Sequence, residues 1–558
     1  MVIPGDLVTL SRPLLIEAMQ RVPSCEIERI LQTRLVPVAW MPHLVFYAAC
    51  GSVAVNYAAR RNLKLVANVA PDDFHWAVRK VWGHKLLHQA TQNLAETTPS
   101  LSAKRRLTPA QALALPSVLA CLAASLVYVP FNIWCLALNA IASLFFLSVV
   151  ALRLFCLWPT PESSSPALKL QPESNLPVYT VLVPVFRETA VLAQLLRALF
   201  RLNYPTGKLD IKIIVEETDL AMRRALASCK LPAHFEIIVV PPGMPQTKPR
   251  ALNYALQFAR GSLLTIYDAE DIPEPSQLRM SAQNFSSGKG DLACLQAKLV
   301  FFNAKENWLT RQFTAEYATL FGLILPALAS HGLPLPLGGT SNHFRTGILR
   351  EVGGWDSYNV TEDADLGLRL ARAGYRTGVI DSLTDEEANT QYPNWFRQRA
   401  RWLKGFMQTW LVHMRNPVMM TRQLGAAGFW VLQSCTAGIF VSALFHPFVL
   451  LLTITQFIIL PRPSPDASLL LIALGGLNLA VFVLGYGVAM IAASKALRRQ
   501  GLTGWWFTLA TMPFYWLLMS AAAWLALWQF IVSPHQWNKT EHGLSKLRKS
   551  GSSSGGLC

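Results

Sequence analysis

Three short clusters of polar residues could carry chemistry in this sequence. Asp268-Ala269-Glu270 comes first, Thr361-Glu362-Asp363 follows, and Gln398-Arg399-Ala400-Arg401-Trp402 is last. Carboxylates two residues apart on a loop can hold Mg²⁺ or Mn²⁺ against a diphosphate. A carboxylate at the start of a helix can accept a proton, and a guanidinium binds phosphate oxygens in a forked geometry.

Each cluster also has a purely structural interpretation. The first could be a solvated acidic turn, the second could place acids where the helix dipole favours them, and the third could be the basic face of an amphipathic helix. Their joint occurrence favours chemistry. We therefore predict Asp268 and Glu270 as metal ligands and Asp363 as a general base, with Arg401 binding a diphosphate and Trp402 stacking on a sugar ring.

The composition indicates that part of the chain lies in a membrane. Of 558 residues, 52% are hydrophobic and 15% are charged, and the formal net charge is +17. The basic residues are scattered and match no nucleic-acid-binding motif, so we predict no nucleic-acid partner. Excess Lys and Arg in cytoplasmic loops explains the sign of the charge. The nine cysteines form no C-x-x-C pair, which argues against a zinc site or a disulfide framework.

Elements that position these clusters can be predicted from the residue patterns. Residues 1–112 predict a small cytoplasmic α+β domain, with helices over 14–31 and 74–94 and a strand over 45–55. Two transmembrane helices are expected in 113–158, and a Pro- and Ser-rich linker in 159–177. Alternating strands and helices over 178–390 predict a mainly parallel α/β sheet, with strands at 179–185, 211–215, 235–240 and 263–267. Asp268 then directly follows a strand, where ligands bind in such sheets.

The rest of the chain predicts further membrane elements. Residues 391–427 are expected to form interfacial helices, and 428–494 two more crossings, which makes four in all. The loop around Lys495–Arg499 favours a cytoplasmic position, so the aromatic segment 495–536 is predicted to be interfacial or re-entrant. Residues 544–558 form a tail whose end, GSSSGGLC, looks like a linker.

On these motifs the chain resembles the processive family 2 glycosyltransferases, which include bacterial cellulose, chitin and hyaluronan synthases and related mannan and glucan synthases. The family pattern is D-x-D, T-E-D and Q-x-x-R-W, and only the first departs here, because Glu270 replaces the second Asp. The resemblance implies an α/β domain of GT-A type inserted between transmembrane helices of a bacterial inner (plasma) membrane. The catalytic domain would face the cytoplasm.

The resemblance also assigns roles to individual residues. Glu216-Glu217 stands where an Asp pair usually contacts the nucleotide base, and residues 537–543 resemble a gating loop, with Trp537, Lys539 and Thr540. Residues expected to bind the nucleotide sugar are Phe186, Glu188, Glu216, Glu217, Lys248, Asn253, Asp268 and Arg401. Those expected at the acceptor are Gly339, Thr340, Ser341, Glu362, Gln398 and Trp402.

The implied activity is processive, inverting polymerisation of a sugar into a β-linked polysaccharide that crosses the membrane. UDP-glucose is the favoured donor, ahead of UDP-GlcNAc and GDP-mannose. The partners would be the nucleotide sugar, the growing polysaccharide and the bilayer. Two alternatives stay open: a non-processive transferase acting on a lipid carrier, and a membrane scaffold with an inactive transferase domain. The N-terminal domain looks somewhat like that of type II secretion ATPases, which in some proteins binds a cyclic dinucleotide; no intact motif is present, which favours a docking or structural role.

Overall fold

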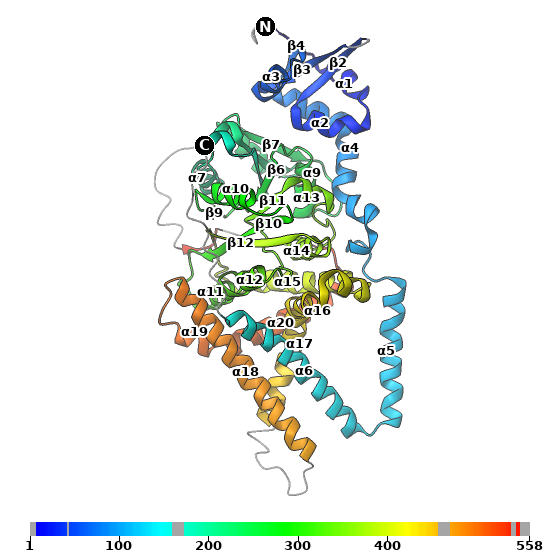
Figure 1. The fold of residues 1–558 in the computed structure, drawn as a ribbon, viewed down its shortest axis with the longest axis vertical. Coiled ribbons are helices and arrows are strands. Elements are labelled where there is room, and N and C mark those ends of the chain that lie inside the picture. Colours follow the sequence, from blue (N-terminus) through cyan, green and yellow to red (C-terminus); the bar gives the residue numbers. More distant parts are fainter. Residues whose placement is uncertain (1–6, 42–43, 159–171, 456–468, 537–542, 547–558) are drawn as a thin grey trace.

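The computed structural model describes residues 7–41, 44–158, 172–455, 469–536 and 543–546. The molecule is elongated, with a small sheet at the N-terminal end, a large sheet in the middle and long apolar helices at the far end (Figure 1). Helix α4 (Pro71–Thr97) runs from the small sheet down the side of the large one. The active-site motifs therefore lie between an N-terminal domain and a helical layer.

The N-terminal domain is α+β, as predicted, and the predicted helix 74–94 is the longer helix α4, but two other predicted elements are shorter than expected. The predicted helix 14–31 is two helices interrupted around Pro23, and the predicted strand 45–55 ends at Cys50, where Gly51 has a positive φ of 76° and the chain turns helical. The four strands lie in the order β1-β4-β3-β2. The elements are β1 (Val8–Thr9), α1 (Arg12–Gln20), α2 (Ile27–Thr33), β2 (Leu35–Met41), β3 (Leu44–Cys50), α3 (Gly51–Arg60) and β4 (Lys64–Val69).

The large sheet has eight strands in the order β7-β6-β5-β8-β11-β10-β12-β9. Strands β7, β6, β5 and β8 are parallel, and antiparallel pairs join β11 to both of its neighbours. The strands are β5 (Tyr179–Val185), β6 (Leu209–Glu216), β7 (Phe235–Val240), β8 (Leu263–Ile266), β9 (Ile272–Pro273), β10 (Leu292–Phe301), β11 (Asn342–Arg345) and β12 (Arg376–Glu386). Strand β5 is an almost continuous apolar run that is buried, as expected for the middle of a parallel sheet.

Helices cover both faces of this sheet, and two of them carry predicted functional residues. Helix α9 (Lys248–Leu256) begins with Lys248, and α14 (Glu362–Arg372) begins with Glu362 and Asp363. The remaining helices of this part are α7 (Leu192–Phe200), α8 (Leu220–Ser228), α10 (Gln277–Ser287), α11 (Trp308–Thr319), α12 (Leu325–Ser330) and α13 (Thr346–Glu351), with a π-helix, η5 (Leu320–Ile324), between α11 and α12.

Below the sheet lies α15 (Tyr392–His413), followed by the helices of the apolar end. These are α16 (Pro417–Cys435), α17 (Ala437–Ile454), α18 (Leu469–Arg499), α19 (Trp506–Ala510) and α20 (Met512–Val532), which join α5 (Pro109–Tyr128) and α6 (Phe131–Leu157). Helices α6 and α18 come from distant parts of the chain and lie together, running in the same direction (Figure 1).

Six helices in the described ranges are long and apolar enough to cross a membrane, by length and composition alone. Four coincide with the predicted crossings: Pro109–Tyr128, Leu136–Leu157, Ala437–Ile454 and Ile472–Arg499. The fifth, Trp308–Ser330, was not predicted, and half of its most apolar stretch is buried inside the protein. The sixth is Met512–Val532. Its interfacial position stays a prediction, because length and composition do not distinguish an interfacial helix from one that crosses the membrane.

A buried ion network fastens the N-terminal domain to the large sheet. Lys212 on β6 is fully buried, and its ammonium lies 2.9 Å from Asp210 and also contacts Glu236 on β7. The Glu236 carboxylate also pairs with two side chains of the N-terminal domain, Arg34 and His75, and His75 Nε2 lies 2.8 Å from it. Burial would raise the pKa of Glu236, but Lys212 and Arg34 lower it well below its usual value. The carboxylate is therefore ionised where the domains meet.

Replacing Glu236 by Ala should loosen this junction. The change leaves Arg34 without its carboxylate and Lys212 with Asp210 alone, and removing one partner of a buried pair costs about 3–5 kcal/mol. Thermal unfolding of the detergent-solubilised protein should show a lower midpoint, and limited proteolysis should release the N-terminal domain. Because the folded pKa is depressed, the wild-type advantage should be present at neutral pH and shrink as the pH falls toward that pKa. An unchanged midpoint would contradict this role.

Candidate active site

Three parallel strands bring their carboxyl ends to one edge of the large sheet, and a cavity of about 410 Å³ opens there. Strand β5 leads into Phe186 and Glu188, β6 ends at Glu216, and β8 leads into Asp268. Ligands of open α/β sheets bind outside these strand ends. The topology thus gathers residues from distant parts of the chain.

Most of the residues predicted for donor, metal or acceptor line this cavity. Those that do are Phe186, Glu188, Glu216, Lys248, Asp268, Glu270, Gly339, Thr340, Glu362, Asp363, Gln398, Arg401 and Trp402. Glu217, Asn253 and Ser341 are not among its lining residues. Trp537, Lys539 and Thr540 lie outside the described residues.

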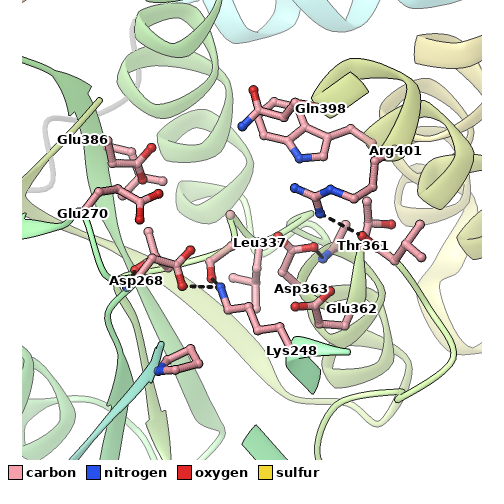
Figure 2. A pocket seen from close by; sticks show the side chains of 18 of the residues that line it. Lys248, Asp268, Glu270, Leu337, Thr361, Glu362, Asp363, Glu386, Gln398 and Arg401 are labelled. Carbon is pink, nitrogen blue, oxygen red and sulfur yellow. Dashed lines mark hydrogen bonds and ion pairs between the residues drawn. The ribbon is translucent and has the colours of Figure 1, made fainter. Parts of the chain in front are cut away.

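Lys248 occupies the centre of the charged end. Its Nζ lies 2.5 Å from Asp268 Oδ1 and donates to the Gly339 carbonyl at 2.8 Å. Figure 2 shows its side chain between Asp268 on one side and Glu362 and Asp363 on the other. Burial would lower the pKa of Lys248, but Asp268 and Glu362 raise it above its usual value. The lysine is therefore a fixed cation, suited to a diphosphate.

Helix α14 begins with two adjacent acids, of which Glu362 is buried and Asp363 is half-buried. Burial and the neighbouring charge of Asp363 raise the pKa of Glu362 to about 7. Burial also raises the pKa of Asp363, although the Ala364 N–H, 2.8 Å from Oδ1, and the charge of Lys248 oppose the change. A carboxylate whose pKa is moved toward neutrality is suited to accept a proton at neutral pH.

Gly339 allows Asp363 to approach the strand-end loop. A Cβ at this position would lie 3.2 Å from Asp363 Oδ2, within a tight contact. The Gly339 carbonyl also accepts the hydrogen bond from Lys248. A side chain here would therefore crowd the proposed base and disturb the lysine at once.

Helix α15 packs against the acidic end of α14. Its Gly405 has no side chain, and a Cβ there would lie 2.4 Å from Thr361 Cγ2, so only glycine fits this approach. One turn earlier, Arg401 Nη1 lies 3.4 Å from the Val360 carbonyl. Farther along, His413 Nε2 lies 3.1 Å from Asp365 Oδ1, with both side chains fully buried. These contacts fix Arg401 beside the two acids, as Figure 2 shows.

The opposite end of the cavity is aromatic and apolar. The Trp402 ring lies nearly parallel to that of Tyr317, with centroids 6.2 Å apart, and the Arg399 guanidinium lies 4.6 Å from the Trp402 centroid. Gln398 accepts a hydrogen bond from Asn389 at 2.8 Å. The far wall includes Phe406, Ile439 of α17 and Met519 of α20. Two helices long enough to cross a membrane thus line the same cavity as the carboxylates.

The carboxylates after β8 fit a divalent cation by their chemistry. Asp268 is partly exposed, and Glu270 lies beside Glu386 in Figure 2. Burial and the charges of Asp271 and Glu270 raise the pKa of Glu386 well above its usual value, so negative charge is in excess here. In the described part of the chain, no three His, Cys, Asp or Glu side chains are placed to hold an ion by themselves. Mg²⁺ and Mn²⁺ are commonly held by one or two carboxylates together with phosphate oxygens, and Asp268 and Glu270 are the carboxylates that would serve here.

Glu386 and Glu387, which also line the cavity, were not predicted. Glu386 ends β12 and Glu387 follows it, and since this strand was not among the predicted ones, no sequence pattern indicated that they lie at the sheet edge. Glu387 accepts hydrogen bonds from the backbone N–H groups of Gly543, Leu544 and Ser545, at 2.8, 2.8 and 2.7 Å. Glu306 accepts those of the Ser545 hydroxyl and the Lys546 backbone N–H. The C-terminal segment is therefore attached beside the cavity.

Four predicted donor or acceptor residues have other partners. Both carboxylate oxygens of Glu216 accept from Arg250 Nη2, at 2.8 and 2.7 Å, so this cavity-lining acid is already paired. Glu217 is 43% exposed and lies 3.8 Å from Arg79. The Ser341 hydroxyl is buried and bonds Thr384 at 2.7 Å. Asn253 bonds the backbone at Trp355 and Ala90. Glu217, Ser341 and Asn253 thus face away from the cavity.

Comparison with known proteins adds independent evidence. Residues 177–405 match the family described as "Glycosyltransferase like family 2". A probable glycosyltransferase of Bacillus subtilis is 25% identical over 234 residues, which cover 41% of this chain and 56% of the relative. A beta-monoglucosyldiacylglycerol synthase of Trichormus variabilis is 26% identical over 46% of this chain and 54% of its own length. A glucomannan 4-beta-mannosyltransferase of Arabidopsis thaliana is 26% identical over 46% and 50%.

The chain thus spans about half the length of the curated relatives that it matches. Among solved structures, a mannosyltransferase of Pyrobaculum calidifontis in complex with GDP-Man and Mn²⁺ gives a TM-score of 0.40 at 16% identity, covering 71% of this chain and 99% of that one. The family match and the sheet order confirm the predicted α/β domain of GT-A type flanked by apolar helices. Residues 177–405 of this chain therefore form a glycosyltransferase family 2 domain.

Proposed function

We propose that this protein transfers a hexose from a nucleotide sugar to an acceptor hydroxyl at a bacterial inner membrane, with inversion at C1, and repeats the reaction to build a β-linked polysaccharide that it moves across the bilayer. One observation carries the proposal. A single cavity joins the carboxylates after β8, the acids of α14, and Arg401 and Trp402 of α15, and its far wall comes from two apolar helices.

The chemistry follows from the positions of these groups. Asp363 takes the proton of the acceptor hydroxyl as its oxygen bonds to C1 of the donor sugar, and the bond from C1 to the diphosphate breaks on the opposite side. Lys248 and Arg401 hold the negative charge that develops on the leaving diphosphate. A divalent cation bound at Asp268 and Glu270 would add to this charge stabilisation.

The aromatic end of the cavity has features that suit the binding of a sugar acceptor. The parallel rings of Trp402 and Tyr317 offer an apolar platform, and Gln398 offers an amide beside it. UDP-glucose remains our preferred donor. The relatives include enzymes named for β-linked mannosyl and glucosyl products, and UDP-GlcNAc and GDP-mannose are the alternative donors.

A lipid acceptor is the second candidate, and the apolar far wall favours it. One experiment separates the possibilities: incubation of the purified protein in lipid nanodiscs with a panel of radiolabelled nucleotide sugars. Long glycan chains would support the polymerase, a single sugar on lipid would support the lipid transferase, and the absence of product with every donor would leave only the scaffold.

Replacing Asp363 by Asn should abolish transfer while nucleotide binding persists, because the amide keeps the shape but cannot take the proton. We expect a rate loss of about 10²–10⁴-fold and little change in nucleotide affinity by calorimetry. Asp381→Asn is the matched control, since Asp381 is 68% exposed and pairs only with Lys298 at the surface. Equal activity in both variants would remove Asp363 from the reaction.

The rate should also fall on acidification, and at a higher pH than an aspartate with an ordinary pKa would give, because the pKa of Asp363 is raised. The base must be ionised, and burial raises the pKa of Asp363, which favours its protonated form. Activity should therefore be present above the raised pKa and lost as the pH falls through it. Glu362→Gln removes one negative neighbour, so the acid limb of its pH–rate profile should move to lower pH. A limb that stays in place would show that the two acids do not interact.

Synthesis should require a divalent cation. Chelation should stop it, and added Mg²⁺ or Mn²⁺ should restore it, because Asp268 and Glu270 lie among excess carboxylates beside the diphosphate position. Asp268→Asn should raise the metal concentration needed for half-maximal nucleotide binding, which calorimetry measures without turnover. Full activity in chelator would contradict the metal assignment.

A further inference from the structure

We propose that Asn253 and Ser357 are positioning residues that join the donor side and the acceptor side of the active site to helix α4 of the N-terminal domain. The inference rests on the proposed function for its catalytic consequence. The joint itself is a backbone carbonyl, that of Ala90 on α4. It accepts from Asn253 Nδ2 at 3.0 Å and from Ser357 Oγ at 2.9 Å.

The side chain of Asn253 joins its own helix, α9, to two other pieces of chain. Besides Ala90, its Nδ2 donates to the Trp355 carbonyl at 2.6 Å, and its Oδ1 accepts the Trp355 N–H at 3.0 Å. The Asn253 side chain therefore forms hydrogen bonds with both the N–H and the carbonyl of one residue, Trp355, in the loop before α14. Leu or Ala cannot make this pair of bonds, and Asp lacks the donor.

The joint is close in sequence to groups that line the cavity. Asn253 lies on α9, whose first residue is Lys248, and Ser357 lies five residues before Glu362. A second bond closes the connection, because the Thr247 hydroxyl donates to the Ser357 carbonyl at 3.0 Å. The separation between Lys248 and the two acids is therefore set by this joint as well as by the sheet.

Further contacts connect the end of α4, and the residues that follow it, to the loop before α14 and to the end of α15. Gln92 Nε2 donates to the Tyr358 hydroxyl at 2.6 Å, and the Ser102 hydroxyl, just beyond α4, lies 3.2 Å from Asp356 Oδ1. Arg415, which follows α15, donates to carbonyls of Pro99, Ser100 and Ser102 at 2.9–3.1 Å. Since α4 also carries the N-terminal sheet, a displacement of that domain would reach the donor side, the acids and α15 together.

The chain contains a matched control for the joint. Gln257, four residues after Asn253, donates its Nε2 to the Leu86 carbonyl of α4 at 3.0 Å. It makes the same kind of bond between the same two segments, one helical turn from the joint. It has no bond to the loop 355–357 among the hydrogen bonds that the structure describes. A loss of α4 packing alone would affect both residues in the same way.

The test compares Asn253→Ala and Ser357→Ala with Gln257→Ala, all in the full-length protein in nanodiscs. Thermal midpoints should fall in all three, and most in Asn253→Ala, which loses its bonds to both Ala90 and Trp355. The kcat for sugar transfer should fall by about ten- to a hundredfold in the first two, because small misplacements of reacting groups are costly, while the Kd for the nucleotide stays within about twofold. Gln257→Ala should keep the wild-type kcat.

Amide hydrogen exchange supplies a readout that does not depend on turnover. The amides of residues 356–363 should exchange faster in Asn253→Ala and Ser357→Ala and at the wild-type rate in Gln257→Ala. If exchange and kcat change alike in all three variants, or in none, the positioning role of Asn253 and Ser357 is contradicted, and α4 contributes packing alone. If the wild-type protein transfers no sugar while exchange still separates the variants, the joint stands and the proposed function fails.

Discussion

One ammonium group organises the active site. Lys248, whose side chain is mostly buried, lies among Asp268, Glu362 and Asp363, and it is the cation that makes this concentration of acids tolerable. An unpaired charge in such a place would be expensive. The strand ends, the glycine at position 339 and the start of α14 all have to meet at this one side chain, and the first turn of α9 has to present it.

Helix α15 has two faces with different tasks. One face carries Arg401 to the acids and Trp402 to the aromatic platform, and the other packs on α17 and α20. Gly405 decides how near the first face can come to Thr361, and His413 fixes the far end to Asp365. The transferase domain and the apolar helices therefore share an element, so neither can shift without moving part of the cavity wall.

Much of this arrangement was predictable from short motifs and from strand periodicity. The strands β5, β6, β7 and β8 lie within one or two residues of the predicted ranges, because buried parallel strands have a strong apolar signal. Asn253, by contrast, belongs to a motif that predicted nucleotide binding. Its side-chain amide instead donates a hydrogen bond to the carbonyl of Ala90, more than 160 positions away. Glu386 and the pairing of Glu216 with Arg250 likewise depend on tertiary contacts that no local pattern reveals.

The attachment of residues 543–546 has a consequence for how this part of the sequence can change. Glu387 and Glu306 hold it mainly through backbone N–H groups, which every amino acid except proline supplies. Divergence among related chains could therefore replace the side chains of Leu544 and Lys546 while the docking geometry persists, whereas the φ of 83° at Gly543 favours glycine there. Such a segment would leave little signature in an alignment beyond that glycine and an absence of proline.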